Sequence, residues 1–326
     1  MTASLLRTGL FLAGLAGLLA TAAAQGAEAY PDKPVTLVVP TAAAGGTDTI
    51  ARLVADALGK SLKQPFVVDN RPGANGILGT EQVARAAPDG YRLLFTYAAA
   101  MVVNPSLYRK LPYDPVKDFA PVAGLGKGGQ IMVVNPASNV KSVADFIALA
   151  KKEPGKLSFG SGSSSSRMAG ELLQQMADIK LLHVPYKSNT LAVTDLLGGQ
   201  IDMMITDTAT GLPQVKGGKL RALGMSSASR SPLAPDVPTI AEAGVKGYEM
   251  GYWFAAYAPA KTPPAVVKRL NELLVKAAKS DSAKTAFYEP SGTEVFTTTP
   301  EDLAKFQAGE SQKWGRIVKA AGIEAE

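Results

Sequence analysis

"VTLVVPTAAAGGTDTIARLVADALGKSL", residues 35–62, decides the fold class because a strand pattern, a run of small residues and a helix pattern follow one another directly. The apolar, β-branched run at 35–40 predicts a buried strand, and the small residues after it predict a loop. From residue 47 on, apolar side chains fall at the spacing of one helix face, namely at Ile50, Leu53, Val54, Ala57 and Leu58. Gly59 is of the residue type that commonly ends a helix in the left-handed conformation. A strand, a loop and a helix in this order form the repeating unit of an α/β protein.

The same unit recurs along the chain. Further short apolar runs predict strands at residues 65–70, 91–97, 130–136, 156–161, 181–186, 201–206 and 220–226. Helical patterns separate these runs, so we expect mainly parallel sheets with helices on both faces. The units form two series, which predicts one lobe of residues 30–125 plus 252–326 and a second lobe of residues 126–251, with a ligand cleft between them. We place the helical tail after residue 263 against the first lobe.

Residues 1–29 have the layout of a cleavable secretory signal peptide. The basic Arg7 precedes an uncharged apolar run, and two small-residue cleavage sites follow, after Ala24 and after Ala29. An uncleaved membrane anchor is the alternative, but the apolar run is short for one. The chain has no cysteine, which excludes disulfides, thiolate chemistry and lipid attachment through cysteine. We therefore expect export to the periplasm.

The net charge of +6 comes from basic residues that are spread along the chain without a dense run. This distribution disfavours a surface for nucleic acid, and we expect no nucleic-acid partner. A mildly positive field suits an anionic small molecule, although a merely soluble surface is the simpler explanation of the charge.

Sequence signatures of an enzyme are sparse. His183, the single histidine, lies in the apolar segment LLHVPY, where a structural role is the commoner one. It cannot form a two-histidine zinc site, and the serines of residues 160–166 lack the G-x-S-x-G pattern of a nucleophile elbow. A serine–histidine–aspartate triad through His183 stays open as a remote alternative. We expect no enzyme activity and no bound metal.

GLGKGG, residues 124–129, matches the G-x-G-x-x-G pattern of dinucleotide-binding loops. Such a loop lies between a strand and a helix, whereas the segment that follows here, residues 130–136, is a predicted strand. We therefore interpret the glycines as a hinge between the lobes and expect no cofactor.

Two loops of small residues, one in each predicted lobe, are candidate anion sites. Residues 41–48 and residues 161–167 each follow a strand and precede a helix, whose N-terminus offers unpaired N–H groups and a positive dipole end. The second loop belongs to GSGSSSSR, residues 160–167, which on composition alone would also fit a flexible linker. The candidate ligand-binding residues in the two loops are Thr41, Ala42, Ala43, Ala44, Gly45, Gly46, Thr47, Asp48, Ser161, Ser163, Ser164, Ser165 and Arg167.

Three more loops follow predicted strands and should face the same cleft, since ligands of open α/β sheets bind beyond the carboxyl ends of the strands. Their candidate ligand-binding residues are Tyr97, Lys187, Ser188, Asn189 and Asp207. Asp48 has two other interpretations, as a cap of the helix after the first loop and as a residue that holds the shape of that loop.

Long stretches of the chain resemble one family of transport receptors. They include VVDNRPGANGILGTEQVARAAPDGY (67–91), NPSLYRKLPYDPVKDFAPVAGL (104–125), PGKLSFGSGSSSS (154–166) and SPLAPDVPTIAEAG (231–244). Over about residues 30–323 the chain is similar to the extracytoplasmic solute-binding receptors of the tripartite tricarboxylate transporters, the Bug family. The resemblance implies an α/β, two-lobed periplasmic-binding-protein fold of the type II Venus flytrap kind, with a mixed sheet in each lobe. It also implies a monomer that captures a small organic carboxylate and passes it, in a transient contact, to a membrane permease.

In such receptors the loop that matches residues 41–48 holds one carboxylate, largely through main chain and ordered water. Loops that match residues 161–167 and 187–190 hold the far end of the ligand, with Asp207 at the matching acidic position. The resemblance implies the same roles here.

This chain departs from the family at Arg167, where many members have histidine. An arginine facing the cleft would bind a second carboxylate, which predicts a dicarboxylate, either aliphatic or aromatic such as terephthalate with Tyr97 stacked on its ring. The alternative is an ion pair of Arg167 with Glu171. A receptor subunit for a two-component sensor kinase is the alternative function, and a secreted hydrolase is the remote one.

Overall fold

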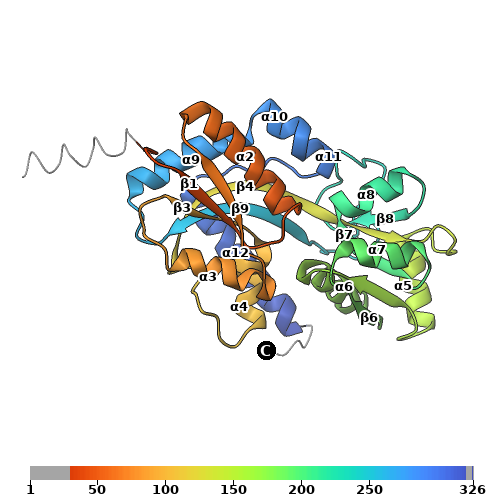
Figure 1. The fold of residues 1–326 in the computed structure, drawn as a ribbon. Helices are drawn as coiled ribbons and strands as arrows, with labels where there is room; N and C mark the ends of the chain where they lie inside the picture. Colours follow the sequence, from red (N-terminus) through yellow and green to blue (C-terminus); the bar gives the residue numbers. More distant parts are fainter. Residues whose placement is uncertain (1–29, 321–324, 326) are drawn as a thin grey trace, which may run out of the picture.

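Nine strands form two connected sheets in the computed structural model, which describes residues 30–320 and 325 (Figure 1). The strands are β1 (Val35–Val39), β2 (Phe66–Asn70), β3 (Arg92–Tyr97), β4 (Phe119–Val134), β5 (Ser158–Ser161), β6 (Leu182–Pro185), β7 (Met203–Asp207), β8 (Arg221–Met225) and β9 (Gly251–Pro259). The path through both sheets is β2-β1-β3-β9-β4-β7-β5-β6, and β8 pairs with β4. The predicted signal peptide and its two cleavage sites lie outside the described residues.

Each sheet mixes parallel and antiparallel pairs. In the first sheet β1 is parallel to β2 and β3, while β9 is antiparallel to β3 and β4. In the second sheet β5 is parallel to β6 and β7, while β4 is antiparallel to β7 and β8. The mixed sheets confirm what the resemblance implies and correct the expectation of mainly parallel ones. The reason is that the chain leaves the first sheet on β4 and returns on β9 beside it, in the opposite direction.

Strand β4 joins the two sheets because its two halves pair with different partners. Gly129 faces Gly251 at the end of the first sheet, and Gln130 faces Asp207 at the start of the second. The GLGKGG motif lies inside this strand, so it forms no strand-to-helix loop. A β-carbon on Gly128 would lie 2.5 Å from Tyr252 Oη, which explains the need for glycine there. The lobe limits at residues 125/126 and 251/252 remain a proposal.

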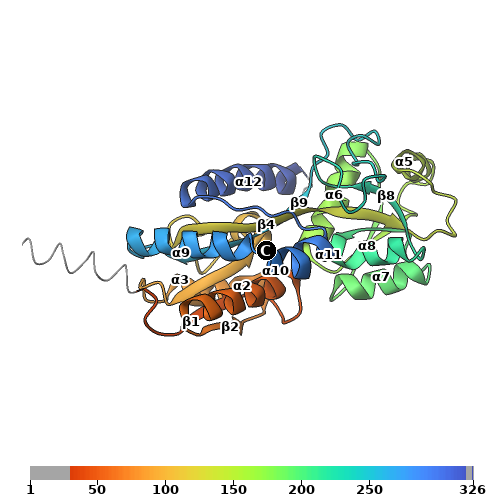
Figure 2. The ribbon, with the colours of Figure 1, turned by 90° about the horizontal axis from the view of Figure 1, so that it is seen from above.

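Helices cover the sheets of both lobes (Figures 1 and 2). They are α2 (Gly46–Leu62), α3 (Ile77–Ala84), α4 (Asn104–Leu107), α5 (Val143–Lys152), α6 (Ser164–Ala177), α7 (Asn189–Leu197), α8 (Thr208–Lys216), α9 (Pro264–Ala278), α10 (Asp281–Ala283), α11 (Glu289–Ser291) and α12 (Pro300–Ala320). Three short segments, η1 (Ala74–Gly76), η2 (Ala99–Val103) and η3 (Lys284–Tyr288), add 3-10 or π turns. Helices α9 and α12 pack against β4, so the tail returns to the first sheet as expected.

The predicted end of α2 is wrong by one turn. The helix continues past Gly59 to Leu62, and Lys63 takes the left-handed conformation with φ 55°. Leu62 packs against the apolar cluster under α2, and this tertiary contact outweighs the local preference of glycine for the helix end.

Apolar side chains are buried on the sheet faces. Ile50 and Leu270 belong to the cluster under α2 and α9, while Trp253 and Trp314 belong to the cluster beside α12. A third cluster, which includes Met204, lies in the second lobe. No helix in the described part of the chain combines the length and the apolar character needed to cross a membrane.

Candidate functional site

A cavity of about 190 Å³ opens where loops of both lobes meet at the carboxyl ends of β1, β3 and β7. It is lined by Thr41, Gly46, Thr47, Tyr97, Ala98, Ala99, Gln130, Ser165, Asn189, Asp207, Ala209, Tyr252, Phe254, Phe287, Ser291 and Thr293. Seven of the sequence-predicted residues are among them, namely Thr41, Gly46, Thr47, Tyr97, Ser165, Asn189 and Asp207. These residues are far apart in the sequence, and the fold brings them into one cavity.

The other predicted residues lie around this cavity without lining it. Residues 42–45 form the exposed part of the first loop, and Asp48 is buried behind that loop. Ser161 ends β5, Ser163 precedes α6, and the backbone of Ser164 begins α6. Lys187 is exposed before Ser188, which caps α7.

The loop of residues 41–48 ends at a helix N-terminus that carries no side-chain cap. Gly45 is the N-cap of α2, and no side chain accepts a hydrogen bond from the first turn there. Gly46 and Thr47 line the cavity at this point. A helix of 17 residues directs its positive dipole end and its first N–H groups to this place, which suits a carboxylate. A β-carbon on Gly46 would lie 3.0 Å from Phe254 Cζ, so a larger residue here would press against the Phe254 ring.

Asp48 holds the shape of this loop. Its Oδ2 accepts from Ala44 N at 2.8 Å and from Arg52 Nε at 3.0 Å, and its Oδ1 accepts from Asn70 Nδ2 at 2.9 Å. Asn70 Nδ2 also donates to Thr41 O at 3.1 Å. Burial raises the pKa of Asp48, but the hydrogen bonds from Arg52, Ala44 and Asn70 and the charge of Arg52 together lower it below its usual value. Asp48 is therefore ionised and supports the loop from behind.

Three helix N-termini of the second lobe are capped by their own side chains. Ser163 accepts from Ser166 N, Ser188 accepts from Leu191 N, and Asp207 accepts from Thr210 N. These are the caps of α6, α7 and α8. The two lobes therefore differ, because the first offers an uncapped helix end and the second offers capped ones.

Asn189 joins the capped loops of the second lobe. Its Oδ1 accepts from Gly162 N at 3.0 Å, and its Nδ2 donates to Asp207 Oδ2 at 2.8 Å. A β-carbon on Gly162 would lie 1.9 Å from the carbonyl carbon of Ser188, so these loops touch backbone to backbone. The loop 160–167 is thus a packed strand-to-helix connection, and the linker interpretation is wrong.

Arg167 lies on α6 with a side chain that is 45% exposed, and its Nε is 3.9 Å from Glu171 Oε1. It does not line the cavity described above. Burial raises the pKa of Glu171, although the charge of Arg167 and a hydrogen bond from Gln174 oppose this shift. The structure thus contains the ion pair that formed the alternative interpretation of Arg167.

His183 is half-buried beside the same helix. Its Nε2 is 2.7 Å from Ser161 Oγ, and its ring lies 4.9 Å from that of Phe159. Burial and the nearby charge of Arg167 lower the pKa of His183, so the ring is neutral near pH 7. Neither His183 nor Ser161 lines the cavity, and the contact is that of a packed structural histidine.

Nine cavity residues were not predicted: Ala98, Ala99, Gln130, Ala209, Tyr252, Phe254, Phe287, Ser291 and Thr293. Tyr252 and Phe254 lie on β9, a strand that the sequence analysis left unassigned. The segment GYWFAAYAP, rich in aromatic residues, was the signal that could have revealed it. Tyr252 Oη lies 3.0 Å from Thr293 Oγ1, and Ser291 Oγ donates to Thr293 Oγ1 at 2.7 Å. The apolar rings and this hydroxyl network form the walls around the helix end.

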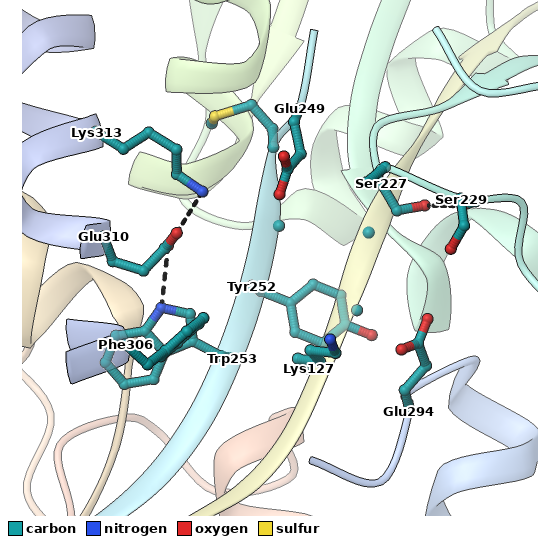
Figure 3. A pocket seen from close by; sticks show the side chains of 15 residues that line it. Lys127, Ser227, Ser229, Glu249, Tyr252, Trp253, Glu294, Phe306, Glu310 and Lys313 are labelled. Atoms are coloured by element: carbon teal, nitrogen blue, oxygen red, sulfur yellow. Dashed lines mark hydrogen bonds and ion pairs between the residues drawn. The ribbon is translucent and has the colours of Figure 1, made fainter. Parts of the chain in front are cut away.

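A second cavity of about 140 Å³ lies along β4 and β9, where the two sheets join (Figure 3). Charged side chains surround it, including Lys127, Glu249, Glu294 and Lys313. Glu310 lies between Lys313 and the indole of Trp253, whose Nε1 donates to it at 3.3 Å (Figure 3). No predicted ligand-binding residue lines this cavity, so the first cavity is the candidate site.

The fold and the cleft define a bilobal solute receptor, and comparisons with known proteins agree. Residues 50–323 match the family model described as "Tripartite tricarboxylate transporter family receptor". The chain is 36% identical to Protein BugT of Bordetella pertussis, over 99% of this chain and 99% of that protein. Two solved structures match about nine-tenths of this chain, and each match covers the whole of the solved chain. Rpa4515 of R. palustris with adipate has a TM-score of 0.83 and 34% sequence identity over 91% of this chain. MatC of Rhodopseudomonas palustris with bound malate has a TM-score of 0.78 and 31% sequence identity over 89% of this chain.

This chain belongs to the tripartite tricarboxylate transporter receptor family, which includes the Bug proteins. It is a solute-binding protein of the periplasmic-binding-protein type. The resemblance seen in its sequence is thereby confirmed.

Proposed function

We propose that this protein captures a small dicarboxylate in the cleft between its lobes and delivers it to a tripartite tricarboxylate transporter permease. The observation that carries this proposal is the uncapped N-terminus of α2, where Gly46 and Thr47 line a cavity with aromatic walls. Neutral N–H donors at a helix end bind a carboxylate without a buried cation. The remaining walls fit a short carbon chain or a ring.

We propose that the second acid group binds to the second lobe. Ser165 on α6 lines the cavity, and Arg167 lies two residues further along the same helix. The loose ion pair of Arg167 with Glu171 at 3.9 Å is compatible with a turn of its side chain toward a bound diacid. The two solved relatives that contain adipate and malate support a dicarboxylate.

A thermal-shift screen tests this proposal with succinate, malate, adipate, citrate and terephthalate against butyrate and benzoate. A ligand that binds only the folded state raises the unfolding temperature, and at a given concentration a tighter ligand raises it more. We expect diacids to stabilise the protein more than the matched monoacids, and Arg167→Ala to remove this preference. Equal affinity for monoacids and diacids contradicts the dicarboxylate assignment, whereas an unchanged diacid preference in Arg167→Ala contradicts only the role of Arg167.

The transport role needs a test in cells. We propose a monomeric, non-enzymatic receptor that acts in the periplasm and meets the permease transiently. Deletion of its gene should abolish uptake of the ligand identified by the screen. Normal uptake, together with loss of a transcriptional response to that ligand, would indicate that the protein is the receptor subunit of a sensor kinase. Ester hydrolysis that disappears in His183→Ala would assign it to the hydrolases.

A further inference from the structure

Gln130 lies at the point where the two sheets join, and its backbone is held in place. Its N–H donates to Ser226 Oγ at 2.6 Å, and its carbonyl accepts from Ser226 N at 2.8 Å. Ser226 Oγ in turn donates to Met250 O at 2.5 Å, and Met250 N donates to Ser226 O at 2.7 Å. The backbone from which the side chain of Gln130 extends to the cavity is therefore held in a fixed position.

The side chain of Gln130 is buried and incompletely bonded. The residue is only 2% exposed, its Oε1 has no hydrogen-bond partner, and it lines the ligand cavity. A buried amide oxygen without a donor is unfavourable, and such atoms are uncommon in native proteins. The terminal torsion of glutamine is broad, so the amide can turn its oxygen toward a donor in the cavity.

Three other polar side chains of the cavity lining, Asp207, Tyr252 and Thr293, already have partners. Asp207 Oδ1 accepts from Thr210 N, and its Oδ2 accepts from Asn189 Nδ2. The hydroxyls of Tyr252 and Thr293 bond to each other. Among the described cavity residues, Thr41 Oγ1 is the second buried polar atom without a partner. Thr41 lies in the loop before α2, where we place the carboxylate, so we assign the buried oxygen of Gln130 to another part of the ligand.

We propose that Gln130 determines ligand specificity by accepting a hydrogen bond from a hydroxyl group on the carbon skeleton of the bound acid. This proposal rests on the proposed function, because it assumes that a carboxylate is anchored at the N-terminus of α2. A hydroxyl fits better than an ammonium group, since both oxygens of Asp207, the acidic side chain in the cavity lining, are already engaged. The ligand class is therefore a hydroxylated organic acid.

Matched ligand pairs that differ by one hydroxyl test the proposal. Isothermal titration compares succinate with malate, glutarate with 2-hydroxyglutarate, and terephthalate with 2-hydroxyterephthalate. In at least one pair we expect the hydroxylated member to bind the wild-type protein on the order of tenfold more tightly, as one well-placed hydrogen bond provides. Gln130→Met, which keeps the side-chain length and removes the amide, should bring that ratio to about one.

Gln307→Met is the matched control. Gln307 is also a buried glutamine, at 4% exposure, but its Nε2 donates to Pro115 O at 3.0 Å, and it does not line the ligand cavity. This variant should lose stability and keep the hydroxyl preference. If Gln130→Met fails to fold, the same titrations are made with Gln130→Glu, which keeps the shape of the glutamine side chain. This variant should also change the affinity ratio between the hydroxylated and the unsubstituted acid.

Two outcomes separate this proposal from the proposed function. Binding of acids with equal affinity within every pair, or a preference that survives in Gln130→Met, overturns the role of Gln130 and leaves the carboxylate receptor intact. Binding of no acid in either screen overturns the proposed function, and the role of Gln130 falls with it.

Discussion

Asn70 Nδ2 lies 2.9 Å from Asp48 Oδ1, and this contact joins the end of β2 to the buried side of the 41–48 loop. The same amide nitrogen donates to Thr41 O, and its oxygen accepts from Arg52 at 2.9 Å. One side chain therefore fixes both ends of the 41–48 loop. The loop is shaped before any ligand arrives, which reduces the entropy lost on binding.

Asn70→Ala should weaken ligand binding as well as stability. The substitution leaves Thr41 O and Asp48 Oδ1 without their donor, so we expect about 1–3 kcal/mol of lost unfolding free energy and at least a severalfold loss of affinity. Urea unfolding and titration calorimetry measure the two effects. Asn271→Ala is the control, because Asn271 Nδ2 bonds Val122 O and Thr298 O elsewhere in the first lobe. If Asn70→Ala loses stability alone, as Asn271→Ala should, the loop is not preorganised by this contact.

Asp48 should make the protein sensitive to acid. Its pKa is lower in the folded protein than the ordinary 3.8, so its ionised form stabilises the fold fully above that value. This stabilisation is lost as the pH falls through the lowered folded pKa. Unfolding free energies measured from pH 6 to pH 2 should therefore fall more steeply for the wild type than for Asp48→Asn. Parallel curves for the two proteins would show that Asp48 does not titrate in this way.

Gly162 should tolerate no side chain. An added β-carbon would lie 1.9 Å from the Ser188 carbonyl carbon, so Gly162→Ala must separate the loops before α6 and α7. We expect a loss of several kcal/mol, about 3 or more, or no folded protein. Gly309→Ala is the matched change, since no atom lies within 4 Å of its added carbon on α12, and it should stabilise by about 0.5–1 kcal/mol. Thermal unfolding of both variants decides the matter, and similar melting temperatures would contradict the close packing.

Glu310 should affect stability more than binding. Glu310→Leu removes the acceptor of Trp253 Nε1 and the partner of Lys313 at the second cavity (Figure 3). We expect a loss of about 1–2 kcal/mol in urea unfolding, with ligand affinity within about threefold of the wild type. A larger loss of affinity would mean that the hinge contact at Trp253 controls closure of the cleft.

The strand-loop-helix units of both lobes could be predicted from periodicity, because a buried strand and an amphipathic helix carry different apolar spacings. Helix α5, for example, spans 143–152, between the predicted strands at 130–136 and 156–161. β9 could not be predicted in the same way, since its alternation is weak and its position depends on β3 and β4 on either side. The cleft residues on β9 and in the segment 291–293 were missed for that reason.

The sequence by itself determined the α/β class, the family and the small-residue loops, because these depend on local composition and spacing. Only the tertiary structure decided which loop is free to bind. It shows that α6, α7 and α8 cap themselves while α2 does not, and that Arg167 pairs with Glu171 outside the cavity lining. It also shows Gln130 buried with an unpaired oxygen at the join of the two sheets. Hydrogen-bond partners from distant segments decide whether a polar group is available, and no local pattern in the sequence contains them.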